Sequence, residues 1–215
     1  SKSFQDTLDL ILSGRYERLD NNSSFDPRIS FQYSTTDKFF LRGSYGTSFT
    51  APSMAQMFSS EIQLGSVRDI NDSPFVRLAL LGNKNLKPAT SENINFGFIW
   101  SIANELYFTI DYWEIDYKNR IEVESPQVLL NTNPYAPSVT RNQFGELIAV
   151  STSYFNEEKT RVNGIDIEAN FSKIFNAGEL NYSIKATQLS KFLTPEHQDE
   201  DHQDSLTLVN RVGKF

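Results

Sequence analysis

Apolar and polar residues alternate along several runs of this chain, and the clearest run covers residues 90–121. In its first arm Ile94, Phe96 and Phe98 alternate with asparagine and glycine. The second arm repeats the pattern over 106–112, where large apolar residues occupy every other position. A period of two predicts a β-strand with one apolar and one polar face. The short link between the arms predicts an antiparallel hairpin.

Seven such runs are predicted as strands, each with roughly the 9–11 residues that a tilted strand needs to cross a bilayer. They lie near residues 8–19, 25–34, 39–49, 91–101, 106–121, 161–172 and 180–191. Short turns are predicted at 35–38, 102–105 and 174–179, and long loops at 52–89 and 122–160. A small hairpin that turns at Asn142–Gly145 is predicted within the second loop. Short turns on one rim and long loops on the other are typical of an outer-membrane barrel.

Composition agrees with an all-β protein, because 17 Phe and 9 Tyr suit the half-buried surface of a sheet. No stretch approaches the 18 apolar residues of a membrane-spanning helix. A net charge of −7 argues against a nucleic-acid partner, and zero Cys excludes disulfides and thiolate metal sites. The chain begins in mid-pattern without an initiator Met or signal peptide, so we expect a piece of a longer protein.

Alternation alone also fits a soluble β-sandwich, such as a ligand-binding or carbohydrate-binding module. Two features favour the barrel. Aromatic residues gather near strand ends, as in an interfacial girdle, and the polar faces carry charges that a wet lumen permits. The residues predicted to line the lumen are Arg15, Glu17, Arg28, Arg42, Asn95, Asp111, Asp166, Glu168 and Lys185.

Candidate chemistry is sparse, and we predict no catalytic residue, metal site or cofactor. Asp166 and Glu168 share a strand face and could act as an acid–base pair, but they fit a charged lumen better. His197 and His202 lie among acidic residues that could bind a cation, but no ligand spacing there enforces a geometry. Four aromatic residues in or beside the long loops could stack on a planar ligand, although loop packing explains them as well. They are Phe49, Phe58, Tyr154 and Phe155.

Four segments carry motifs of one known family, in that family's order and spacing. LRGSYGTSFTAPSMAQMF at 41–58 holds an F-x-A-P-S strand end, and GNKNLKPATSENINFGFIW at 82–100 holds an N-x-x-L-K-P-x-T-S-E strand entry. LYFTIDYWEIDYKNRIE at 106–122 and RVNGIDIEANF at 161–171 hold the D-Y-W-x-I-D and G-I-D-x-E patterns. Together they resemble the barrel of TonB-dependent outer-membrane receptors.

One position departs from the family pattern. Ala89 stands where the family commonly has Glu. We therefore expect the acidic partner at that rim to be missing or moved to Glu92.

The resemblance implies part of a plugged, 22-stranded transmembrane barrel of the bacterial outer membrane, of which this chain supplies about a third. It implies extracellular long loops and a plug domain that lies outside this chain. It also implies active uptake of a scarce nutrient, namely a siderophore, haem, cobalamin, an oligosaccharide or a peptide, with no enzymatic reaction. The implied partners are the nutrient, outer-membrane lipid and the TonB–ExbB–ExbD complex, reached through the plug. The isolated piece has two open sheet edges and an apolar surface, so we expect it to self-associate or rearrange in water.

Overall fold

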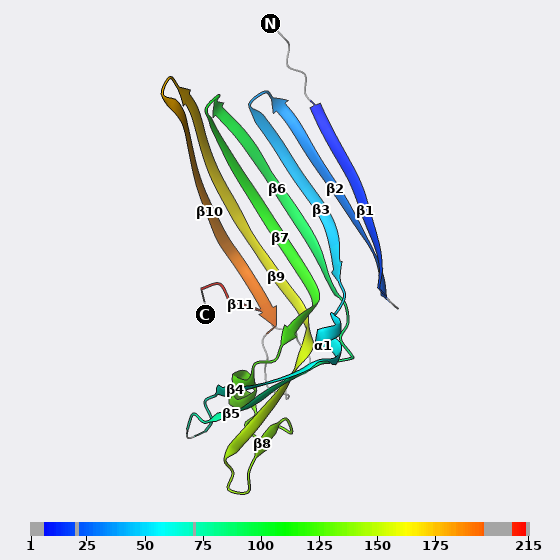
Figure 1. Cartoon of the computed structure of the whole chain (residues 1–215). Coiled ribbons are helices and arrows are strands. Elements are labelled where there is room, and N and C mark those ends of the chain that lie inside the picture. The colour runs from blue at the N-terminus through cyan, green and yellow to red at the C-terminus, as the bar shows by residue number, and fades with distance from the viewer. Residues whose placement is uncertain (1–6, 20–21, 71, 196–207, 214–215) are drawn as a thin grey trace.

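The computed structural model describes residues 7–19, 22–70, 72–195 and 208–213. Within these residues eleven strands form one connected, largely antiparallel sheet, accompanied by two short helices (Figure 1). In chain order the elements are β1 (Thr7–Leu19), β2 (Asn22–Thr36), β3 (Phe39–Thr50), α1 (Met54–Phe58), β4 (Ser60–Ser66), β5 (Phe75–Leu81), β6 (Ala89–Ala103), β7 (Leu106–Val123), α2 (Pro126–Thr132), β8 (Val139–Arg141), β9 (Leu147–Phe175), β10 (Gly178–Pro195) and β11 (Leu208–Asn210).

The long strands follow one another across the sheet in the order β1-β2-β3-β6-β7-β9-β10-β11, and each neighbouring pair is antiparallel. The three short turns gather at one rim, and the long connections leave from the other (Figure 1). Among the described residues the sheet stays open, with β1 at one side and the β10–β11 end at the other. The predicted all-β antiparallel meander is confirmed.

The long connections contain more structure than the sequence pattern predicts. The segment 52–89 holds α1, β4 and β5, and the segment 122–160 holds α2, β8 and the first part of β9. β9 begins at Leu147, well before the predicted start at 161. Its early part pairs in parallel with β5, where Arg77–Leu81 align with Ala149–Ser153. Local alternation cannot reveal such a pairing, because the two strands are far apart in the sequence.

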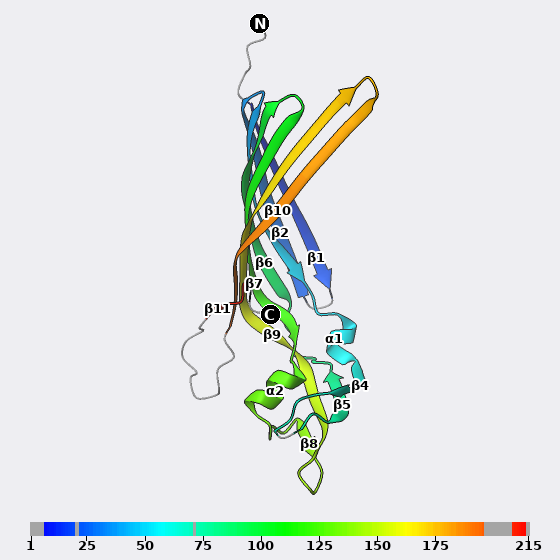
Figure 2. The same cartoon turned by 90° about the vertical axis from the view of Figure 1, so that its left-hand side faces the viewer.

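These connections fold onto each other as one body, here named the loop unit and comprising residues 54–81 and 126–153. Its sheet has the order β4-β5-β9-β8, and the predicted hairpin at Asn142–Gly145 joins β8 to β9. Figure 2 shows the loop unit beyond the end of the long sheet. Its core consists of Val67, Val76, Leu130, Leu147 and the fully buried Val150. Neither helix of the described residues has the length and hydropathy to cross a membrane.

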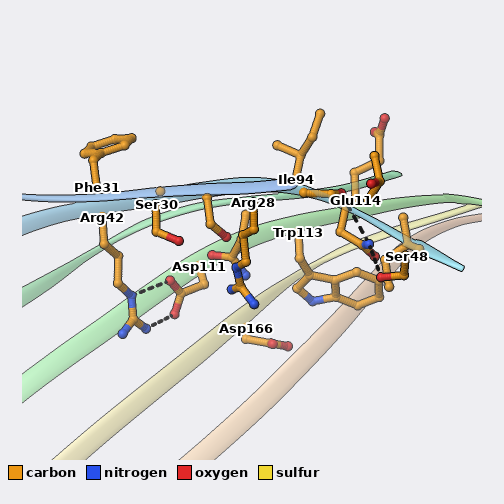
Figure 3. A pocket seen from close by; sticks show the side chains of 17 residues that line it. Arg28, Ser30, Phe31, Arg42, Ser48, Ile94, Asp111, Trp113, Glu114 and Asp166 are labelled. Carbon is orange, nitrogen blue, oxygen red and sulfur yellow. Dashed lines mark hydrogen bonds and ion pairs between the residues drawn. The ribbon is translucent and has the colours of Figure 1, made fainter. Parts of the chain in front are cut away.

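The long sheet has one apolar and one polar face, as the alternation predicts. Phe98 pairs with Ile110, which pairs with Ile167, so these residues share the apolar face. Figure 3 shows Phe31 and Ile94 on the side of the sheet opposite Arg42, Asp111 and Trp113. The apolar face is uncovered among the described residues, and Leu12 is 77% exposed, Trp100 48% and Tyr182 60%.

The apolar residues of this face form an oblique band. One cross-strand row starts at Leu12 on β1, passes Ile94 on β6, and becomes polar at Glu114 on β7 and Lys191 on β10. On β10 the apolar positions lie nearer the short turn, at Leu180–Ile184. The apolar positions therefore shift along the strand direction from one strand to the next. With strands about 4.8 Å apart and a rise of about 3.3 Å per residue, this shift means that the strands are inclined by about 40° to the direction perpendicular to the band.

Candidate functional site

The polar face brings together all nine residues that the sequence predicts as lumen-lining. The register aligns Arg42 on β3 with Gly97, Asp111 and Asp166 on the next three strands of the sheet. Other rows of the same face hold the remaining members. Arg28, Asn95, Glu168 and Lys185 lie one or two rows from Arg42, and Arg15 and Glu17 lie farther along β1. A common face is thus established for the set, and its identity as a lumen remains a proposal.

An ion pair on this face spans a whole strand. Arg42 donates from Nε to Asp111 Oδ1 at 2.9 Å and from Nη2 to Oδ2 at 2.5 Å (Figure 3). The two residues belong to β3 and β7, and Gly97 of β6 lies between them. A Cβ at Gly97 would collide with Asp111 Oδ1 and with the carbonyl oxygen of Ile110. Because Gly97 has no side chain, the path along which the Arg42 guanidinium reaches Asp111 across β6 stays open.

A shallow hollow of about 650 Å³ lies around this pair. Arg28 and Trp113 line it beside Asp111 and Asp166 (Figure 3). No carboxylate among the described residues lies within ion-pair distance of Arg28, and Asp166 Oδ1 is buried without a hydrogen-bond partner. The hollow therefore offers one unpaired cation and one unpaired carboxylate oxygen to whatever faces the sheet.

The other four charged members of the predicted lumen-lining set, Arg15, Glu17, Glu168 and Lys185, are paired with neighbours. Glu168 Oε1 lies 3.0 Å from Lys185 Nζ and accepts from Asn170 Nδ2 at 2.8 Å. Arg15 pairs with Glu17 two residues away on the same strand. Glu168 is thus held in an ion pair across β9 and β10, as expected of a charged wall and not of an acid–base pair with Asp166. The described residues hold no group of His and acidic side chains arranged for a metal ion, and His197 and His202 lie outside them.

The four aromatic ligand candidates lie on three different elements. Phe49 lies four residues after Tyr45 on β3. Residues an even number apart on a strand share a face, so Phe49 lies on the apolar face with Tyr45. Phe58 ends α1; the residue is 55% exposed, and Lys84 Nζ lies 5.4 Å from its ring centroid. Tyr154 and Phe155 are consecutive residues of β9 where it joins the loop unit. The structure thus offers Phe58 as an open aromatic surface, while the ligand role of all four stays a prediction.

The position of Glu92 contradicts its expected role as a substitute for a Glu at position 89. Ala89 and Glu92 are three residues apart on β6, so their side chains point to opposite faces. Glu92 instead receives Lys118 Nζ at 3.1 Å on the apolar-face side. The acidic group that the family pattern has at position 89 is therefore absent there.

A second polar cluster, which the sequence does not predict, fastens the loop unit. Arg141 donates to both carboxylate oxygens of Asp69, at 2.7 and 2.8 Å, and to the carbonyl oxygens of Pro134 and Gly145. The side chains of Arg141 and Asp69 are only 13% and 8% exposed, respectively. The hydrogen bonds from Arg141 hold the pKa of the Asp69 carboxyl below its ordinary value. This pair joins the two long connections of the chain.

A side-chain amide strengthens the same junction. Gln127 Oε1 accepts from the Arg68 backbone N–H at 2.7 Å, and Gln127 Nε2 donates to the Arg68 carbonyl at 2.9 Å. Asn156 similarly bonds both backbone groups of Lys87, at 2.7 and 2.8 Å. Each amide imitates a strand partner, so the two connections are tied by directional bonds as well as by charge.

Comparison with known proteins gives consistent results. The family model described as "TonB dependent receptor-like, beta-barrel" matches residues 2–211. The chain is 22% identical over 226 residues to the heme/hemopexin utilization protein C of Haemophilus influenzae (strain 86-028NP), covering 98% of this chain and 28% of that protein.

Solved structures of similar fold include two receptors. One is the siderophore receptor PirA from Acinetobacter baumannii, with a TM-score of 0.58, 19% identity, and coverage of 87% of this chain and 27% of that one. The other is a mutant of the ferric enterobactin receptor PfeA from Pseudomonas aeruginosa in complex with enterobactin, with a TM-score of 0.59, 20% identity, and coverage of 87% of this chain and 27% of that one. The chain spans little more than a quarter of each of these relatives.

Proposed function

This chain belongs to the family of TonB-dependent receptor-like β-barrels, as its four motifs predict, and from that premise we propose that it forms part of the wall of an outer-membrane nutrient transporter. In this proposal the polar face lines the lumen, and the apolar face meets lipid. The loop unit then lies on the extracellular side.

The oblique apolar band carries this proposal. A soluble β-sandwich covers the apolar face of each sheet with another sheet, whereas here that face is uncovered among the described residues. The inclination of the strands to the normal of the band, about 40°, matches the roughly 35–45° by which the strands of transmembrane barrels tilt. The band is then the section of a tilted sheet that lies between two membrane surfaces. The sandwich alternative accounts for neither observation.

For the nutrient we propose an iron-bearing chelate, either haem or a ferric siderophore. The curated relative is named for haem utilisation, and the solved relatives for siderophore and ferric enterobactin reception. The exposed Phe58, with Lys84 Nζ over its ring, offers an anionic chelate an aromatic surface and a cation. We further propose that energy comes from the TonB–ExbB–ExbD complex through a plug that the polar face surrounds.

Cysteine labelling in the full-length protein tests the assignment of faces. Cysteines at Phe108 and Ile110 should report lipid, and those at Thr109 and Asp111 should report water, because neighbouring residues in a strand face opposite sides. A second pair tests the tilt: Leu12 and Lys191 share one cross-strand row, yet cysteine at Leu12 should report lipid and at Lys191 water. Equal labelling of these two would contradict a tilted transmembrane sheet.

Uptake of iron tests the transport role. A strain that lacks the full-length gene should lose growth on haem or on one ferric siderophore as sole iron source, and the gene should restore it. Restoration should also require TonB, because uptake against a gradient needs energy from the inner membrane. Unchanged growth of the deletion strain on every iron source tried would contradict an iron-bearing nutrient.

A further inference from the structure

The helix that carries Phe58 has no hydrophobic anchor of its own. α1 is five residues long, and none of its residues is buried. A helix this short is unstable by itself in water, so its position depends on the groups to which it is bonded. Its N-terminus is closed locally by the capping box of Ser53 and Gln56. The support for its C-terminal end, where Phe58 lies, comes from another part of the chain.

The segment 82–87, which opens the strand-entry motif, supplies this support. The Gly82 N–H donates to the Ser59 carbonyl at 2.7 Å, and the Asn83 N–H donates to the Gln56 carbonyl at 2.9 Å. A Cβ at Gly82 would lie only 2.8 Å from backbone atoms of the last two residues of α1. The backbone of the segment therefore lies directly against the C-terminal end of the helix.

Asn83 also binds the strand that carries Tyr154. Its Nδ2 donates to the Tyr154 carbonyl at 2.8 Å, and its Oδ1 accepts from the Asn85 N–H at 2.9 Å. The second bond fixes which end of the amide faces β9. The buried Leu86 donates its N–H to the Asn83 carbonyl at 3.3 Å and anchors the segment. One residue thus joins the helix of Phe58 to the strand of Tyr154, although the two lie in different long connections.

We propose that Asn83 is a positioning residue of the ligand site, which fixes Phe58 relative to Tyr154. The residue after it is Lys84, so the same bonds also hold the lysine over the Phe58 ring. A site whose parts are fixed before the ligand arrives loses less conformational freedom on binding. Asn83 itself does not touch the ligand in this arrangement. The inference rests on the proposed role of Phe58 and Lys84 in binding an anionic iron chelate.

The test compares Asn83→Ala with the wild-type full-length protein in detergent, with hemin and ferric enterobactin as probes. Asn83→Ala should weaken binding of the probe that the wild type binds by about tenfold, because the Tyr154 carbonyl loses its donor and α1 loses its fixed place. Hydrogen exchange of residues 54–59 should accelerate by a similar factor. The matched control is Asn142→Ala at the hairpin tip, where the amide oxygen likewise accepts backbone N–H groups. It should leave both quantities unchanged.

A double-mutant cycle separates positioning from direct contact. If Asn83 acts through Phe58, the variant Asn83→Ala/Phe58→Ala should bind the probe at most about twofold more weakly than Phe58→Ala alone. Gly82→Ala gives an independent second variant, because its Cβ would displace the backbone of α1 without removing any side-chain hydrogen bond. It should show a loss of affinity similar to that of Asn83→Ala and the same lack of additivity with Phe58→Ala.

Three outcomes would overturn the proposal. These are an unchanged affinity in Asn83→Ala, additive losses in the cycle, and an equal loss in Asn142→Ala. Circular dichroism of the variants controls for folding. Failure of the wild-type protein to bind either probe would overturn the proposed nutrient and the ligand-positioning role with it. Exchange at 54–59 would still report whether Asn83 holds α1, so the two failures are distinguishable.

Discussion

Replacing Arg141 by alanine is expected to separate the two halves of the loop unit while the long sheet remains folded. The change leaves the Asp69 carboxylate without its guanidinium in a site where it is only 8% exposed. Removing one partner of a buried ion pair costs roughly 3–5 kcal/mol; we expect about 2–3 kcal/mol here, because the loop unit is thin and water lies close. Hydrogen exchange of residues 126–153 should accelerate by about the corresponding factor, some 30- to 160-fold.

Arg15 provides a matched control for this change. It also forms an ion pair, with Glu17, but its side chain is 72% exposed. Arg15→Ala should therefore leave exchange in the loop unit unchanged, since exposed pairs contribute little. Unchanged exchange in Arg141→Ala, or equal acceleration throughout the long sheet, would show that the Asp69 pair does not hold the loop unit together.

The same pair predicts a response to acid. Because the folded-state pKa of Asp69 is lowered, the stabilisation from this carboxylate is fully present above the unfolded value of about 3.9. It is lost as the pH falls through the lowered folded value. Exchange in the loop unit, corrected for intrinsic pH dependence, should stay constant from pH 8 to 5 and rise below about pH 4. In the Asp69→Asn variant the two halves of the loop unit should be held together more weakly at neutral pH. Its exchange should show no further rise below about pH 4.

Replacing Gly97 by alanine is expected to disrupt the centre of the polar face. The new Cβ would meet the carbonyl oxygen of Ile110, which is backbone, as well as the Asp111 carboxylate. Either β6 and β7 move apart or the Arg42–Asp111 pair opens. Forcing extra volume into a packed site costs about 1–3 kcal/mol. We expect a corresponding fall in the urea midpoint of the full-length protein refolded in detergent or lipid.

Gly46 is the control for Gly97. It lies on the same face, one strand away in the sheet, and a Cβ there would meet Arg28 Cγ at 3.1 Å. Arg28 Cβ at 3.2 Å and the Pro27 carbonyl oxygen at 3.3 Å are also near, but each neighbour needs to move by only a few tenths of an ångström, so Gly46→Ala should change the midpoint much less. Equal effects of the two substitutions would mean that loss of glycine as such, and not the path of Arg42 to Asp111, causes the change.

The faces of the long sheet could be predicted from the sequence because alternation is a local property. Alternation places Ile110 and Asp111 on opposite faces, and it places Arg42 and Asp166 on the polar sides of their own strands. The register of the structure then brings Arg42, Asp111 and Asp166 onto one face. Gly43 lies against the Phe31 ring, where a Cβ would collide with it, so a glycine within this strand permits close packing.

The loop unit could not be predicted in this way. Asp69 and Arg141 are 72 residues apart, and nothing in either local pattern marks them as partners. Val150 is fully buried although the sequence predicts only a small hairpin there, because Leu78 of β5 and Val139 of β8 flank it and Leu130 of α2 belongs to the same core.

β9 is a single strand of 29 residues that belongs to both the long sheet and the loop unit. Deletion of one residue from its middle would turn every later side chain of the strand to the opposite face. Divergence in chain length should therefore be concentrated at the hairpin tip around Gly145, where a turn absorbs an inserted residue without altering any register. Through β9, any change of length in the loop unit is therefore constrained by the part of the same strand that pairs within the long sheet.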